Sequence, residues 1–279
     1  FFRLSPRRRQ SYSRQIWRIA YPCGIHFLIS QIIGYMALWL ITRSGGGMEI
    51  YYKQVVLLTG LTGILSIIPC LWFYSRDRIA RKHGGLVLPQ KPWKLDLPEI
   101  ILFLGMGAAF SQYANMLVGM LQSVLNYKEY QETMDQMTAG KSMWFLIICM
   151  GVIAPLAEEI VFRWLIYLRL RDYMRMGFAM VISGLIFGIY HGNLVQAVYA
   201  GLLGMFFAYF LEISGCLWSS VLLHMGANIW SLVSTDLVSR MLQKNPMYIL
   251  IMLFALLVIL IYGIFYFRAR THGRMKRVL

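Results

Sequence analysis

The chain has 279 residues, of which 58% are hydrophobic and only 14% are charged, and its formal net charge is +15. Soluble domains carry about 25% charged residues, so this composition excludes an ordinary soluble domain and predicts an integral membrane protein. The basic residues stand between apolar runs rather than in one patch. That pattern favours a lipid bilayer as the partner and disfavours nucleic acid.

Apolar runs follow one another along the whole chain. A membrane-spanning helix needs about 20 mainly apolar residues. Eight candidate spans are found, at 19–41, 54–75, 97–121, 142–168, 176–192, 194–212, 216–235 and 247–267. The sequence therefore predicts an all-α fold, a polytopic membrane helical bundle with about eight transmembrane helices. The polar segment 126–141 is predicted to be a solvated outer loop.

These spans divide the chain into four parts. Residues 1–18 form a basic arm, and 19–141 hold the first three spans and the outer loop. Residues 142–235 hold spans four to seven, and 236–279 hold the eighth span and a basic tail. No A-x-A-like cleavage site follows the first apolar run, so a removable signal peptide is not expected. The four cysteines lie in apolar runs without metal-ligand spacing and are interpreted as packing residues.

The distribution of Lys and Arg predicts the orientation in the membrane. The arm 1–18, the connections 76–94 and 169–175, and the tail 268–279 hold 20 of the 27 basic residues, and the alternate connections hold six. Because basic loops stay in the cytoplasm, both termini are predicted to be cytoplasmic. An even number of spans satisfies this orientation.

Polar and ionisable side chains inside membrane spans are rare and are often functional. Three clusters of them lie in the fourth, fifth and seventh spans: Glu158, Glu159, Arg163, His191, His224 and Asn228. A lone histidine in such a helix can be a hydrogen-bonding strut, but three clusters on nearby spans favour a shared polar site. His26, Gln112 and Asn115 lack partners at helical spacing and are interpreted as packing or lumen residues.

Helical geometry separates the two adjacent glutamates. Glu159 and Arg163 are four residues apart, so they share a face and are predicted to form an ion pair. Glu158 points about 100° away and lacks a partner in its own helix, which makes it the candidate functional carboxylate. His224 and Asn228 are also four residues apart, so the amide either fixes the histidine tautomer or joins it in donating to one oxygen atom.

The position of His191 conflicts with a simple spanning helix. At about 1.5 Å per residue, it lies more than about 20 Å from Arg175, near the outer face. The fifth span would have to begin deeper, tilt strongly, or break near Gly184 or Gly188. These two glycines have the GxxxG spacing that permits close helix approach.

Three motifs occur in order on these spans: "EEIVFR" at 158–163, "FGIYH" at 187–191 and "HMGAN" at 224–228. Over about residues 142–235 the chain resembles the CAAX protease and bacteriocin-processing family, also called Abi. The resemblance implies that this part is the catalytic core of an intramembrane endopeptidase of the type II CAAX prenyl endopeptidase kind. Trp164 stands where the family usually has glycine.

The resemblance also implies roles for the motif residues. Glu158 and His191 would activate water, and His224 and Asn228 would bind the oxyanion. Three further residues, Glu159, Arg163 and Phe187, would be supporting residues. The implied substrate is a membrane-associated protein or peptide, including lipidated ones, and the implied location is a bacterial plasma membrane. The sequence leaves the oligomeric state open.

Two other classes of function stay open at this stage. One is a proton-coupled transporter, in which Glu158 and the histidines would relay protons, although the internal repeat common in transporters is not visible. The other is a non-enzymatic membrane partner, such as a bacteriocin-immunity protein.

No cofactor is predicted, and zinc is the alternative. Its ligands would be Glu158, His191 and His224, which come from three helices and lack H-E-x-x-H spacing. A second carboxylate that would orient both histidines is not evident in the sequence.

The predicted topology can be tested by labelling. Single cysteines replace Ser5, Thr133 or Thr271 in a cysteine-free variant, and intact cells are treated with a membrane-impermeant thiol reagent. Only the cysteine at 133 is expected to react, because both termini are predicted to be cytoplasmic. Reaction at 5 or 271 would contradict the topology.

Overall fold

The computed structural model describes residues 11–83, 94–120 and 127–275. Its longest single helices are α1 (Tyr12–Arg43), α2 (Met48–His83), α3 (Leu97–Met120), α9 (Leu194–Ser214), α10 (Leu217–Lys244) and α11 (Met247–Met275). Two shorter helices are α4 (Tyr127–Thr138) and α8 (Met176–Tyr190). No strand occurs in the described ranges, so the predicted all-α fold is confirmed.

One continuous rod carries the E-E-x-x-x-R motif. It consists of α5 (Met143–Leu146), the π-helix η1 (Ile147–Ile153), α6 (Ala154–Glu159), the π-helix η2 (Ile160–Tyr167) and α7 (Leu168–Arg171). We call Met143–Arg171 the central rod. Within the described ranges, the rod and the six longest helices are long and apolar enough to cross a membrane, and α8 is a shorter apolar helix. The predicted polytopic bundle of about eight helices is therefore confirmed.

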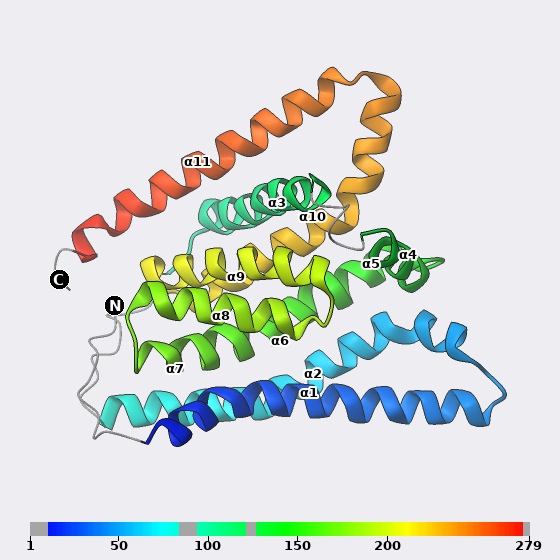
Figure 1. The fold of residues 1–279 in the computed structure, drawn as a ribbon. Helices are drawn as coiled ribbons and strands as arrows, with labels where there is room; N and C mark the ends of the chain where they lie inside the picture. Colours follow the sequence, from blue (N-terminus) through cyan, green and yellow to red (C-terminus); the bar gives the residue numbers. More distant parts are fainter. Residues whose placement is uncertain (1–10, 84–93, 121–126, 276–279) are drawn as a thin grey trace.

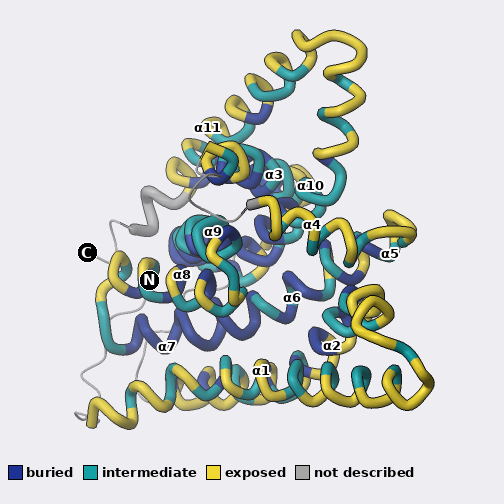
Figure 2. Tube along the Cα trace, turned by 45° about the vertical axis from the view of Figure 1, so that its right-hand side comes forward, coloured by how far each residue is buried: buried dark blue, intermediate teal, exposed yellow. Residues whose placement is uncertain are grey.

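The helices are arranged in layers around the central rod (Figure 1). Helices α1 and α2 lie along one side of the rod, and α8 and α10 pack against it elsewhere. Every residue from 159 to 172 is buried, whereas α1 and α11 expose many large apolar side chains (Figure 2). The core of the bundle therefore surrounds the second half of the rod, and the apolar outer faces suit contact with lipid.

Several boundaries differ from those predicted. Helix α1 begins at Tyr12, so part of the basic arm is helical, and α11 continues into the basic tail. A spanning helix needs no stop signal where it leaves the apolar layer, so hydropathy alone does not mark its end. Residues 1–10 of the arm, 276–279 of the tail and residue 121 of the third span lie outside the described residues.

The predicted outer loop at 126–141 is wrong in its structure, because most of it forms helix α4. Tyr130 and Met137 are two turns apart and pack against apolar clusters of the bundle. Lys128 and Glu132 form an exposed ion pair with N and O atoms 3.9 Å apart. The segment is polar on average but amphipathic at helical spacing, and average polarity conceals this pattern.

Glycines set the closest helix crossings. A Cβ atom at Gly188 of α8 would collide with the carbonyl oxygen of Ala197 on α9, and one at Gly226 of α10 would collide with that of Leu104 on α3. The close approach predicted from the GxxxG spacing is confirmed. Helix α8 is unbroken, so the suggested break near Gly184 or Gly188 is wrong.

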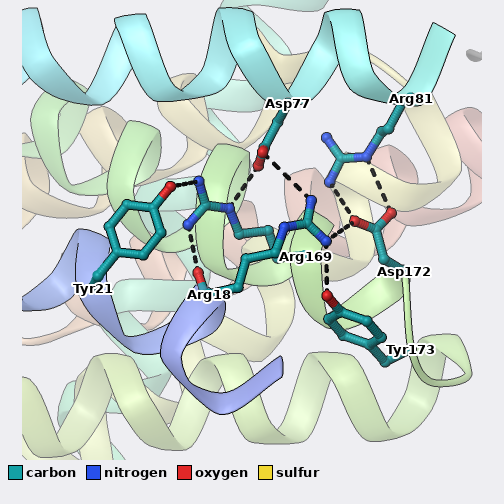
Figure 3. A network of polar contacts seen from close by, with 7 residues as sticks. All are labelled: Arg18, Tyr21, Asp77, Arg81, Arg169, Asp172 and Tyr173. Carbon is teal, nitrogen blue, oxygen red and sulfur yellow. Dashed lines mark hydrogen bonds and ion pairs between the residues drawn. The ribbon is translucent and has the colours of Figure 1, made fainter. Parts of the chain in front are cut away.

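A charged network ties α1 and α2 to the end of the central rod (Figure 3). Arg169 Nε donates to Asp77 Oδ2 at 2.6 Å, joining the rod to α2. Arg18 Nη1 on α1 donates to Asp172 Oδ2 at 2.8 Å, and Arg81 Nε on α2 donates to Asp172 Oδ1 at 3.1 Å. Acidic and basic side chains alternate in this network, so each buried carboxylate is neutralised by neighbouring arginines.

Candidate active site

Glu159 joins two helices at the centre of the polar cluster. Its side chain on α6 is fully buried, and its Oε1 accepts a hydrogen bond from Nδ1 of His224 on α10 at 3.0 Å. Its Oε2 lies 3.4 Å from Nε of Arg163, so the predicted ion pair is present. The bond to His224 was missed from sequence, because helical spacing reports contacts only within one helix. An ionised carboxylate only accepts, so Nδ1 of His224 carries a proton.

Arg163 is held by aromatic rings as well as by Glu159. Its guanidinium carbon lies 4.5 Å from the ring centroid of Phe187 and 5.6 Å from that of Phe207. A cation over an aromatic face without water is stabilised by about 2 kcal/mol. A Cβ atom at Gly204 would lie 2.9 Å from Nη2, so glycine leaves room for the guanidinium. Phe187, a supporting residue according to the resemblance, thus contacts Arg163.

Glu158 faces the open side of this cluster. Its side chain is 19% exposed, and its Oε2 lies 3.7 Å from Nε2 of His224. His224 therefore stands between two adjacent carboxylates, one buried and one at a cavity. The resemblance implied that Glu158 works with His191. In the structure the histidine beside Glu158 is His224.

His191 follows the last residue of α8, and its ring packs against that of Phe187. Its Nδ1 is 2.8 Å from the carbonyl oxygen of Phe187. The ring centroid of Phe187 is 4.8 Å from that of His191 and 5.5 Å from that of His224. Among the described residues, no hydrogen bond or ion pair joins His191 to Glu158. Its role in activating water stays a prediction.

Asn228 donates a hydrogen bond to a backbone carbonyl group of the rod. In η1 the backbone bonds run from residue i to i−5, as from Ala154 N–H to Cys149 O. The next bond in this series would need the N–H of residue 155, which is Pro155 and has none. The carbonyl oxygen of Met150 is left without that donor, and Asn228 Nδ2 donates to it at 2.9 Å. Asn228 thus bonds to the rod, and Glu159 rather than Asn228 holds Nδ1 of His224. That Asn228 and His224 both donate to one oxygen atom stays a prediction.

A cavity of about 210 Å³ lies beside Glu158. Residues of α1, α2, α6 and α8 line it, among them His26, Ser30, Thr59, Glu158 and Tyr190. His26 was interpreted from sequence as a packing or lumen residue, and Tyr190 was not considered. The partner of His26 is Tyr190, far away in the chain, so no local pattern could have revealed the pair.

The predicted zinc ligands do not come together as a metal site. Glu158 and His224 are neighbours, but His191 is turned toward the backbone of Phe187. Among the described residues, no group of three or more His, Cys, Asp or Glu side chains has a suitable arrangement for a metal ion. The zinc alternative stays a prediction.

Comparisons with known proteins match the motif segment. Residues 140–230 match the family model described as "Type II CAAX prenyl endopeptidase Rce1-like". The family resemblance is confirmed for this segment. A Bacillus subtilis (strain 168) protein named "Putative membrane peptidase YdiL" is 26% identical over 106 residues, which cover 38% of this chain and 43% of that protein. The match thus spans less than half of that relative. No solved structure matches the chain.

The Rce1-like segment contains the three motifs but not the whole cavity. Helices α1 and α2, which supply much of the cavity wall, lie outside residues 140–230. Trp164, the residue that departs from the family pattern, has its ring centroid 5.2 Å from that of Tyr74 and 6.3 Å from that of Trp218. This departure therefore fills space between the rod and its neighbours, away from Glu158.

The shared carboxylate of Glu159 predicts a folding defect when it is removed. Glu159→Ala leaves Arg163 buried and unpaired, and breaking a buried pair costs about 3–5 kcal/mol. We expect lower expression and a lower unfolding temperature in detergent. The double change Glu159→Gln and Arg163→Met should recover part of the loss. A wild-type unfolding temperature in the single variant would contradict this role.

Glu49→Ala is a matched control for that experiment. Glu49 and Lys53 also form an i,i+4 ion pair, with N and O atoms 2.7 Å apart, but both side chains are exposed. Exposed pairs contribute little to stability. The Glu49 variant is therefore expected to unfold at the wild-type temperature.

The bond from Asn228 to the rod predicts that the stability lost in Asn228→Ala can be partly restored by a second substitution. Asn228→Ala leaves the Met150 carbonyl without a donor, which costs about 1–3 kcal/mol when the group is away from water. Adding Pro155→Ala restores a backbone N–H, so the double variant should be more stable than Asn228→Ala alone. Thermal unfolding in one detergent measures both, with Asn115→Ala on the exposed side of α3 as control. Equal stability of the single and double variants would contradict the rescue.

Proposed function

We propose that this protein is an intramembrane endopeptidase that hydrolyses a peptide bond of a membrane-associated protein or peptide. The observation that carries the proposal is the position of Glu158, which borders a cavity while the adjacent Glu159 is buried against Arg163 and His224. The carboxylate of Glu159 joins the rod to α10, and the carboxylate of Glu158 is accessible to water in the cavity. The Rce1-like family match supports the same class of activity.

In the proposed reaction Glu158 acts as general base. Its carboxylate takes a proton from a water molecule in the cavity, and the water oxygen attacks the carbonyl carbon of the scissile bond. The C–N bond then breaks, and the proton on Glu158 passes to the leaving nitrogen. The products are a carboxylic acid and an amine, and Glu158 returns to its starting state.

His224 is proposed to stabilise the negative charge on the carbonyl oxygen. Its Nδ1–H is held by Glu159, which fixes the ring and leaves Nε2 directed toward Glu158. With Nε2 also protonated, the charges of Glu158, His224, Glu159 and Arg163 alternate and sum to zero, which suits a site without bulk water. Removing one oxyanion donor typically slows turnover about 100- to 1,000-fold.

The proposed site also includes Asn228 and His191, as the family resemblance implies. Asn228 uses one amide hydrogen for Met150, and its second hydrogen remains for the oxyanion. His191 would need to turn from the Phe187 carbonyl to reach water beside Glu158. The substrate, lipidated or not, and the location in a bacterial plasma membrane with cytoplasmic termini are parts of the same proposal.

Peptide mapping tests the activity without a known substrate. Membranes from cells that produce wild-type protein or Glu158→Gln are compared for new peptide termini, and a peptide found only with wild type is then given to purified protein. We expect Glu158→Gln to slow cleavage about 100- to 10,000-fold, as for loss of a general base. Glu132→Gln on exposed α4 is the matched control and should cleave normally.

Two outcomes would overturn the proposal. Cleavage by Glu158→Gln at the wild-type rate would exclude the general-base role. Proton movement into proteoliposomes without any cleavage would indicate a transporter instead. A separate arm tests zinc: chelated protein, checked by elemental analysis, is expected to keep most of its activity. Stoichiometric zinc whose removal abolishes activity and whose return restores it would assign a metallopeptidase.

A further inference from the structure

A hydrogen-bonded pair crosses the cavity wall from α1 to α8. Nδ1 of His26 lies 2.5 Å from the hydroxyl oxygen of Tyr190, and the two ring centroids are 5.5 Å apart. His26 is buried, with 7% of its surface exposed. The contact joins a residue outside the Rce1-like segment to one inside it.

This pair shares its cavity with Glu158. Of the four predicted catalytic residues, only Glu158 is among the side chains that line the cavity, and His26 and Tyr190 are there with it. The cavity volume of about 210 Å³ leaves room for water beside Glu158.

We propose that Tyr190 is a further catalytic residue, whose hydroxyl donates a hydrogen bond to the carbonyl oxygen of the scissile bond. His26 is its positioning residue and holds that hydroxyl in place. The inference rests on the proposed endopeptidase function. It adds a donor from α8, in the cavity that Glu158 borders.

The charge of Glu158 selects the direction of the His26–Tyr190 bond. If Nδ1–H of His26 donates to the tyrosine oxygen, the phenolic proton is free to point into the cavity. A carboxylate in the same cavity favours hydrogen-bond donors over lone pairs on the facing wall. The tautomer with the proton on Nδ1 is thus the favoured one, and it makes Tyr190 a donor toward the substrate.

Tyr190 does not depend on its hydroxyl for packing. Its ring lies against Phe162, with ring centroids 5.1 Å apart. Tyr190→Phe therefore keeps the ring and removes only the donor. A purely structural role for the His26–Tyr190 bond would lower stability and leave the rate constants of the folded enzyme unchanged.

Kinetics with the mapped peptide test the inference. Tyr190→Phe is expected to lower kcat about 100-fold, with KM within about twofold, because the donor acts mainly on the transition state. His26→Leu should lower kcat similarly, and His26→Asn, whose Nδ2 takes the position of Nδ1 and can donate to the tyrosine oxygen, should recover most of it. If His26 acts through Tyr190, the double variant His26→Leu and Tyr190→Phe should be no slower than the slower single variant.

Tyr113→Phe is the matched control. The hydroxyl of Tyr113 donates to the carbonyl oxygen of Leu253 at 2.6 Å, between α3 and α11 and outside the cavity lining. The substitution Tyr113→Phe also removes a hydrogen-bonded tyrosine hydroxyl, and it should leave kcat unchanged. Unfolding temperatures of all variants are measured in the same detergent, and rates are taken only from folded protein.

The outcomes separate this inference from the proposed function. If wild type cleaves and Glu158→Gln does not, a wild-type kcat for Tyr190→Phe overturns the inference alone. So does a double variant in which the two losses multiply, because His26 and Tyr190 would then act independently. If wild type cleaves no peptide, the proposed function fails and this inference fails with it.

Discussion

The site depends on one shared carboxylate. Glu159 is fully buried, and a charge in that position is stable only with partners that compensate it. It finds Arg163 on its own rod and His224 on α10, so it fixes the rotation of the rod and the depth of α10 together. Once Glu159 faces inward, the residue before it in the sequence must face elsewhere. That geometric consequence places Glu158 at the cavity.

A second constraint comes from the backbone of the same rod. Pro155 lacks an N–H, and the widened turns of η1 direct this deficit to the carbonyl of Met150. Asn228 supplies the missing donor from α10, one turn beyond His224. Rod and α10 are thus joined twice, through a charged contact and through a backbone contact. Both lie within the H-x-x-x-N motif, so this motif has a structural role whatever its part in chemistry.

The sequence predicted much of the fold because bilayer thickness leaves few choices. The eight apolar runs correspond to the central rod, α8 and the six longest helices, and the Glu159–Arg163 pair followed from spacing within one helix. Contacts between helices were harder. The bonds of Glu159 to His224 and of His26 to Tyr190 join residues 65 and 164 positions apart, and only packing decides them. The π-helical turns of η1 and η2 were also missed, because side-chain periodicity assumes regular α-helix geometry.

The cavity wall is built from two separate sources, and this division affects how such a protein can change over evolution. The rod and α10 carry the charges and the motif residues, whereas α1 and α2 supply much of the opposite wall. A single methyl group at Gly34 on α1 would already meet the hydroxyl of Tyr51 on α2 at 3.0 Å. Small substitutions on these two helices therefore reshape the cavity without touching Glu159 or its partners. Chains that share the same motif segment can diverge in what they admit while their chemistry stays the same.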